Sequence, residues 1–124
     1  VGFYRDRSYW AWDSNSLDFV TPFGIDIEFE KGEMLDFSHS AMNHAMLITG
    51  VNLVNGKPTR WKIENSWGSD NGKAGYYVMS ASFFDKFVYQ AVVDKKFLNA
   101  KEVKAAAGKP KHLNPWDPMG TLAD

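Results

Sequence analysis

Residues 60–67 read RWKIENSW, and this stretch decides the fold together with HAMLITGV at residues 44–51. In the first stretch polar and apolar residues alternate, which is typical of a strand with one buried face. The second stretch is an apolar run of strand length. Between them lies the pair Asn55-Gly56, a strong signal for a tight turn. The sequence therefore predicts an antiparallel hairpin made by residues 44–51 and 60–67.

The same alternation sorts the side chains of the second strand. The predicted buried face carries Trp61, Ile63, Asn65 and Trp67. An amide on an otherwise apolar face needs hydrogen-bond partners, because leaving it unpaired costs about 1–3 kcal/mol. Asn65 therefore either caps a turn at the strand end or serves as the partner of another polar side chain.

The remaining elements are short. We expect a third strand at residues 75–79, a helical turn at 83–86 capped by Ser82, and a fourth strand at 87–93 that is rich in β-branched and aromatic residues. Alternating residues also predict a short strand within residues 25–30. Short, closely connected strands of this kind indicate a small, mainly antiparallel sheet.

Composition limits the classes of function. The chain has 124 residues, 23% of them charged, and a formal net charge of −1, which lacks the basic character of a dedicated nucleic-acid binder. A helix needs about 18–20 apolar residues to cross a bilayer, and no apolar run in the sequence approaches this length. Cysteine is absent, so disulfides and a cysteine nucleophile are excluded within the chain, and a reducing compartment is expected. The start at Val1 has no signal peptide, and we expect it to lie inside a longer protein.

Two polar residues are candidates for chemistry. His44 is either a hydrogen-bonded structural histidine or a general base, since imidazole changes charge near neutral pH. The antiparallel pairing brings His44 to the end of the hairpin where Asn65 lies. There the amide oxygen of Asn65 would accept a proton from one imidazole nitrogen and leave the other to face a nucleophile. Trp67 is either ordinary core or a cover that excludes water from this contact.

Other candidates are weaker. His39 and His44 have no accompanying set of acidic ligands, so a metal site is not expected there. His112 directly follows a lysine-rich stretch, residues 101–111, which we interpret as a solvated face. Ser66 and the other serines lack the surroundings of a nucleophile elbow.

Several motifs together resemble one peptidase family. They are Asn43-His44-Ala45-Met46, Glu64-Asn65-Ser66-Trp67-Gly68, Gly75-Tyr76-Tyr77, the run at 88–93 and Pro115-Trp116-Asp117-Pro118-Met119-Gly120. The chain resembles the aminopeptidase C and bleomycin hydrolase family of papain-like cysteine peptidases. The resemblance covers residues 44–98 and 115–123, and residues 1–43 more loosely.

The resemblance implies an α+β, papain-like fold, of which this chain is the C-terminal, β-rich half with a small antiparallel sheet or barrel. Residues 1–98 would belong to the peptidase domain, and residues 99–124 would form a linker and an extended C-terminal arm. In the family's Cys-His-Asn triad, His44 would be the general base and Asn65 its orienter. The Cys would lie in an N-terminal half that is missing here. No cofactor or metal is implied.

The resemblance also implies how substrate is bound and what the partners are. Trp67 would shield the triad and lie among the substrate-binding residues. In the family the arm lies along the cleft, so a terminal carboxylate near Ala123 would meet the α-amino group of a peptide; Asp124 stands one residue past the usual small terminal residue. We expect peptide substrates, the missing half and further copies in a hexamer as partners, a cytoplasmic location, and no nucleic acid or membrane.

Three hypotheses of function follow. The first is a C-terminal fragment of a cysteine aminopeptidase that supplies the His and the Asn of the triad. The second is an inactive papain-like remnant that acts as a peptide-binding or assembly module. The third is a metal-dependent hydrolase that uses His39 and His44.

Overall fold

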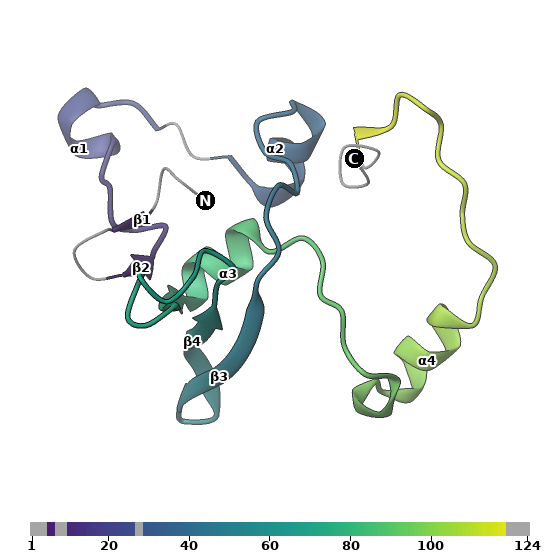
Figure 1. The fold of residues 1–124 in the computed structure, drawn as a ribbon. Coiled ribbons are helices and arrows are strands. Elements are labelled where there is room, and N and C mark those ends of the chain that lie inside the picture. The colour runs from purple at the N-terminus through teal and green to yellow at the C-terminus, as the bar shows by residue number, and fades with distance from the viewer. Residues whose placement is uncertain (1–4, 7–9, 27–28, 119–124) are drawn as a thin grey trace.

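The structure, a computed structural model, describes residues 5–6, 10–26 and 29–118. Within these ranges the chain forms a five-stranded sheet in the order β1-β2-β5-β4-β3 (Figure 1). The strands are β1 (Arg5–Asp6), β2 (Ala11–Trp12), β3 (Leu47–Val54), β4 (Lys57–Glu64) and β5 (Tyr76–Ser80). The helices are α1 (Val20–Phe23), α2 (Lys31–Asp36), α3 (Ala81–Phe87), the 3-10 turn η1 (Lys95–Phe97) and α4 (Ala100–Ala106).

The predicted hairpin is confirmed. Strands β3 and β4 pair antiparallel, from Leu47 opposite Glu64 at the open end to the turn. The turn residues Asn55 and Gly56 have φ values of 51° and 77°, the left-handed conformations that a two-residue hairpin turn requires. The ladder is shorter at its open end than predicted and stops where Leu47 lies opposite Glu64. On the other side of β4, the backbone N–H of Asn65 donates to the carbonyl of Gly75 at 3.0 Å.

The core lies on one face of the hairpin and on β5. Its buried members are Trp12, Ile63, Tyr77, Met79 and Phe83. On β4 the side chains alternate as expected, with Ile63 buried and its neighbours on the strand exposed. Strand β5 pairs antiparallel with β4 and parallel with β2, so the sheet is mainly antiparallel, as predicted.

Helix α3 begins at Ala81, earlier than predicted. Its N-cap is Ser80, whose hydroxyl accepts the backbone N–H of Phe83 at 3.1 Å. A capping residue must have an extended backbone directly before the helix, and Ser80 has φ −71° and ψ 157°. The prediction of Ser82 as the cap is wrong, because Ser82 lies inside the first turn and its hydroxyl donates to Asp13.

The predicted fourth strand is also wrong. Helix α3 extends to Phe87, and residues 88–94 are not in a strand. Val88 packs against the core, but Val92 and Val93 are 94% and 53% exposed, and no strand of the described chain pairs with this segment. β-propensity reflects packing on a sheet surface, and without a neighbouring strand it does not create one.

In the described part of the N-terminal third, helices α1 and α2 lie on either side of the strand expected within residues 25–30. Of residues 25–30, the described ones, 25–26 and 29–30, are not in a strand, and 27–28 lie outside the described residues. Helix α2 starts directly afterwards with a capping box, in which the Glu33 carboxylate accepts the backbone N–H of Glu30 at 2.9 Å. The alternating residues at 25–30 therefore precede the first turn of helix α2 and do not form a strand in their described part.

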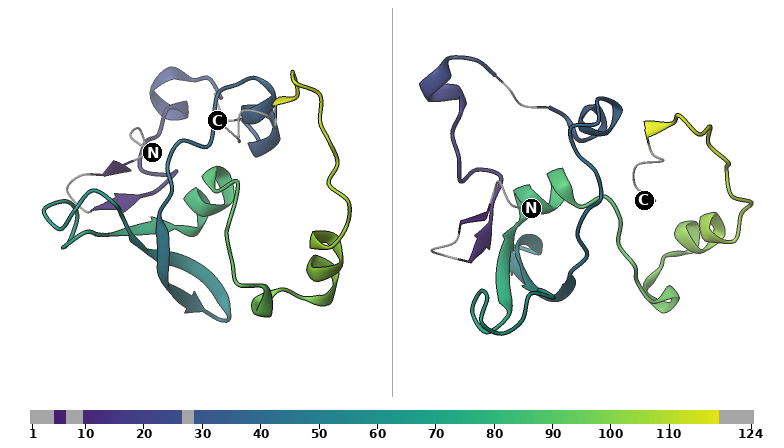
Figure 2. Two further views of the ribbon diagram at one scale, coloured as in Figure 1. Left: turned by 45° about the vertical axis from the view of Figure 1, so that its right-hand side comes forward. Right: turned by 45° about the horizontal axis from the view of Figure 1, so that its top comes forward.

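The chain after α3 runs away from the sheet. Both views of Figure 2 show residues 88–118 in an extended path that carries α4 apart from the strands. Helix α4, capped by Asn99, has no buried residue, which fits the interpretation of residues 101–111 as a solvated face. Of the helices in the described ranges, none combines the length and the apolar character needed to cross a membrane.

Candidate active site

Two strand ends bring the candidate residues together. His44 lies in the segment that leads into β3, and Asn65 directly follows β4. Because Leu47 pairs with Glu64, both residues lie at the open end of the hairpin. His44 Nε2 is 2.8 Å from Asn65 Oδ1, a hydrogen bond. The strand pairing thus places the two side chains in contact, as the sequence predicts.

A second donor fixes the direction of this hydrogen bond. The backbone N–H of Ser66 donates to the same Oδ1 at 2.8 Å, so this atom is the amide oxygen and not the amide nitrogen. An oxygen accepts only, and His44 must therefore donate through Nε2–H. The neutral form of the imidazole is thereby held in the tautomer that carries its proton on Nε2, and in this tautomer Nδ1 has a lone pair that can accept a proton.

The contact is sheltered from water on two sides. Asn65 is only 7% exposed, and its Nδ2 has no hydrogen-bond partner among the described residues. The ring of Trp67 lies over the imidazole of His44, with the ring centroids 5.0 Å apart and the planes tilted by 30°. Trp67 is 37% exposed, so it forms a cover at the surface and does not belong to the deep core. Exclusion of water strengthens a hydrogen bond of this kind.

A glycine-rich loop places Trp67. Residues 68–75 form the predicted loop, and Asn71 Nδ2 donates to the Trp67 carbonyl at 2.7 Å. Gly72 has φ +68°, and a Cβ at that position would lie 2.5 Å from the carbonyl oxygen of Tyr76. The close approach requires glycine there, which lets the loop fold back tightly and return the chain to β5.

The other candidates lie elsewhere. The ring of His39 stacks on Phe29 at 4.8 Å, whereas His44 binds Asn65. The described residues contain no group of three or more His, Asp or Glu side chains that could hold a metal ion, so the metal hypothesis lacks a ligand set there. His112 is exposed. Ala123 and Asp124 lie outside the described residues.

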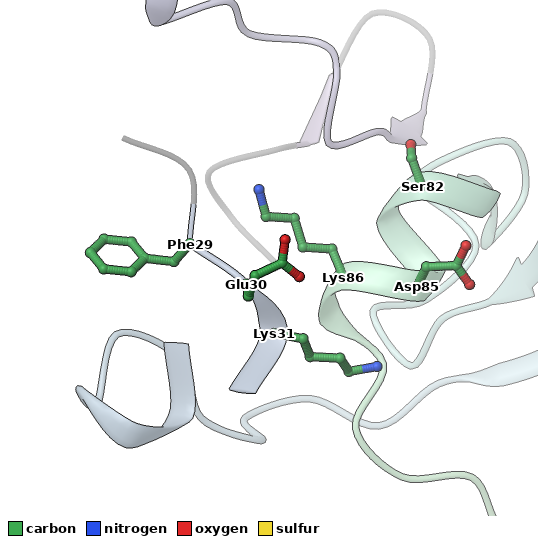
Figure 3. A pocket seen from close by; sticks show the side chains of 6 residues that line it. All are labelled: Phe29, Glu30, Lys31, Ser82, Asp85 and Lys86. Carbon is green, nitrogen blue, oxygen red and sulfur yellow. The ribbon is translucent and has the colours of Figure 1, made fainter. Parts of the chain in front are cut away.

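An open pocket of about 250 Å³ lies between the start of α2 and α3 (Figure 3). It is lined by Phe29, Glu30, Lys31, Ser82, Asp85 and Lys86. None of His44, Asn65 and Trp67 contributes to it. The chemistry of the His–Asn pair is therefore located at the open end of the hairpin and not in this pocket.

Two aromatic residues near the site were missed by sequence reasoning. Trp12 and Tyr77 both contact the ring of Trp67, with centroid distances of 6.4 Å and 6.0 Å. The tryptophan-rich cluster at residues 9–12 is visible in the sequence. However, nothing in the sequence links it to a residue more than fifty positions away.

Comparisons with known proteins give the family of the chain. The family model described as "Peptidase C1-like family" matches residues 1–120. The chain belongs to this family. Aminopeptidase C of Listeria innocua is 43% identical over 99% of the chain, which corresponds to 28% of that protein. Aminopeptidase C of Lactobacillus delbrueckii subsp. lactis is 56% identical over 82% of the chain and 23% of that protein.

A solved structure has the same fold over the matched residues. The crystal structure of PepW from Lactobacillus rhamnosis superposes with a TM-score of 0.85 at 48% sequence identity, and covers 98% of this chain and 28% of that one. The α+β, papain-like fold and the resemblance to aminopeptidase C are confirmed. The chain spans about a quarter of the length of the relatives it matches.

Proposed function

We propose that this chain supplies the general base and its orienting residue to a cysteine aminopeptidase. The thiol would come from polypeptide outside the 124 residues, since the chain contains no cysteine. The observation that carries the proposal is the hydrogen bond from His44 Nε2 to Asn65 Oδ1, which leaves Nδ1 free. The names of the relatives support the reaction class.

The proposed reaction follows from the free nitrogen. His44 Nδ1 takes the thiol proton, which gives a thiolate and an imidazolium. The thiolate attacks the carbonyl carbon of the peptide, and the imidazolium returns the proton to the leaving amine as the C–N bond breaks. The resulting thioester is hydrolysed when Nδ1 takes a proton from water, the hydroxide adds to the acyl carbon, and the thiol leaves protonated.

Asn65 acts in each of these steps without exchanging a proton. Its Oδ1 faces Nε2–H in both charge states of the imidazole, and the hydrogen bond is stronger when the ring is charged. The amide therefore stabilises the imidazolium and prevents the ring from turning. Trp67 supports the charged ring through the face of its indole, an arrangement that favours a cation.

The exposed surface of β3 supports a larger assembly around the site. Leu47 and Leu53 are 62% and 56% exposed on a strand at the edge of the sheet. A long apolar edge strand is rarely left open in a folded protein. We propose that polypeptide carrying the thiol covers this side, and that the segment containing Ala123 and Asp124 lies near the substrate's α-amino group.

The test uses the natural protein that contains this chain. It should release the first residue from an aminoacyl-anilide and leave the N-acetylated form intact. His44→Ala should lower kcat/KM by about 10²–10⁴-fold, the usual contribution of a general base, whereas His112→Ala should leave it unchanged. Activity within threefold of the parent in a folded His44→Ala variant would refute the proposal. Peptide binding without any turnover in the parent would instead favour the inactive binding module.

A further inference from the structure

Trp12 lies behind the cover of the candidate site. Its side chain is fully buried and stacks on Tyr77 with a centroid distance of 4.4 Å and an interplanar angle of 27°. Its ring also meets Trp67 edge-on at 6.4 Å, and Tyr77 meets Trp67 edge-on at 6.0 Å. Trp12 and Tyr77 therefore form an aromatic wall against the inner side of Trp67. The ring of Trp67 also contacts the imidazole of His44, with the two ring centroids 5.0 Å apart.

We propose that Trp12 is a positioning residue, which holds Trp67 against the imidazole of His44 and so keeps water from the hydrogen bond to Asn65. The inference deepens the proposed function, because it rests on the same His–Asn pair. Asn71 holds the carbonyl of Trp67, whereas the partly exposed ring of Trp67 lies between the imidazole of His44 and the rings of Trp12 and Tyr77. The buried wall of Trp12 and Tyr77 therefore limits how far this ring can move away from His44.

The backbone around Trp12 is anchored to β5. Trp12 pairs with Met79 in the parallel ladder, and the carbonyl of Trp10 accepts the N–H of Val78 at 3.0 Å. Trp10 has φ +52°, a conformation that is costly for a bulky residue. Such a conformation persists only where the surroundings determine it. Here Trp10 is held by the hydrogen bond to Val78 and by the edge-on contact of its ring with Tyr77.

The residue after Trp12 anchors the strand to α3. Asp13 Oδ1 accepts hydrogen bonds from Ser80 Oγ at 2.9 Å and from Ser82 Oγ at 3.2 Å. Ser80 is also the N-cap of α3, so one carboxylate ties the end of β2 to the start of this helix. Trp12 is thus fixed on both sides along the chain, and the wall behind Trp67 cannot easily move.

The experiment measures the shelter directly and needs no turnover. In the natural protein containing this chain, labelled with ¹⁵N-histidine, NMR would give the solvent exchange rate of the His44 Nε2–H proton. Trp12→Phe replaces the indole that contacts Trp67 by a smaller ring. Because Trp67 can then move away from His44, the exchange rate should rise by about tenfold or more. Trp61→Phe is the matched control, because Trp61 packs against the same core but stacks on Phe84, with the ring centroids 4.7 Å apart. It should change the rate less than twofold.

Two results would overturn the inference. One is an exchange rate in Trp12→Phe within twofold of the parent. The other is an equal rise in Trp12→Phe and Trp61→Phe, which would show a general loosening of the core. If Trp12→Phe does not fold, Asp13→Asn weakens the anchor at the surface and should raise the rate several-fold, and an unchanged rate in that variant would also refute the inference. Absence of peptidase activity in the parent would refute the proposed function but leave this measurement valid.

Discussion

Replacing Asn65 by alanine separates the chemistry of the site from the stability of the fold. The change removes Oδ1, which accepts from His44 Nε2 and from the backbone N–H of Ser66, both at 2.8 Å. It also removes Nδ2, a buried donor without a partner in the described chain. Ser66 is exposed, so water can accept the hydrogen bond from its backbone N–H in place of Oδ1. The stability lost with the two hydrogen bonds to Oδ1 should therefore nearly equal the stability gained when the unpaired Nδ2 donor is removed.

The kinetic effect should be much larger. The lost hydrogen bond is made to a ring that becomes charged during the proposed reaction, and hydrogen bonds to charged groups contribute about 1.5–3 kcal/mol. If Asn65 stabilises the imidazolium by this amount, kcat/KM should fall about 10- to 160-fold. The free energy of unfolding should change by less than about 1 kcal/mol, since the buried unpaired donor disappears as well.

The assay is hydrolysis of an aminoacyl-anilide by the natural protein containing this chain, with urea titration of each variant. Asn52→Ala is the matched control. It removes an asparagine from the same hairpin, whose Nδ2 donates to Thr59 Oγ1 at 2.7 Å, and should leave kcat/KM unchanged. A folded Asn65→Ala variant with kcat/KM within twofold of the parent would refute the role of the amide.

Three further substitutions test the fold that supports the site, each by urea titration. Ile63→Ala opens a cavity at a fully buried position and should lower the free energy of unfolding by about 2–5 kcal/mol; a loss below about 1 kcal/mol would contradict the placement of the core. Ser80→Ala removes the cap of α3 and should cost about 0.5–2 kcal/mol, whereas Ser69→Ala in the exposed loop should cost almost nothing. Gly72→Ala should cost about 1–3 kcal/mol through its left-handed backbone and its contact with Tyr76, and a neutral effect would mean that the loop is placed wrongly.

The hairpin was predictable because its signals are local. The Asn55-Gly56 turn sets the register, and the period of two in β4 sets which side chains are buried. Register and strand direction together determine that the two strand ends meet. The contact between His44 and Asn65 therefore follows from the sequence alone.

The failures have a different origin. The segment at 88–94 has strand-like composition, but its structure depends on whether another strand lies beside it, which composition does not report. Helix α2 was missed because its cap is Glu30, a residue type that rarely signals a helix start. Strands β1 and β2 have two residues each, so they show no period. The role of Trp12 depends on the parallel pairing of β2 with β5, a contact between distant parts of the chain.

The most direct test of the His–Asn pair is the pH dependence of thiol alkylation in the natural protein that contains this chain. An unperturbed cysteine thiol has a pKa of about 8.5, whereas a cysteine paired with an imidazolium reacts as a thiolate at much lower pH. We predict rapid alkylation of one thiol by iodoacetamide at acidic pH in the parent, and its loss in His44→Ala, where the reaction should follow ordinary thiol ionisation. The same acidic reactivity in both proteins would contradict the assignment of His44 as the base.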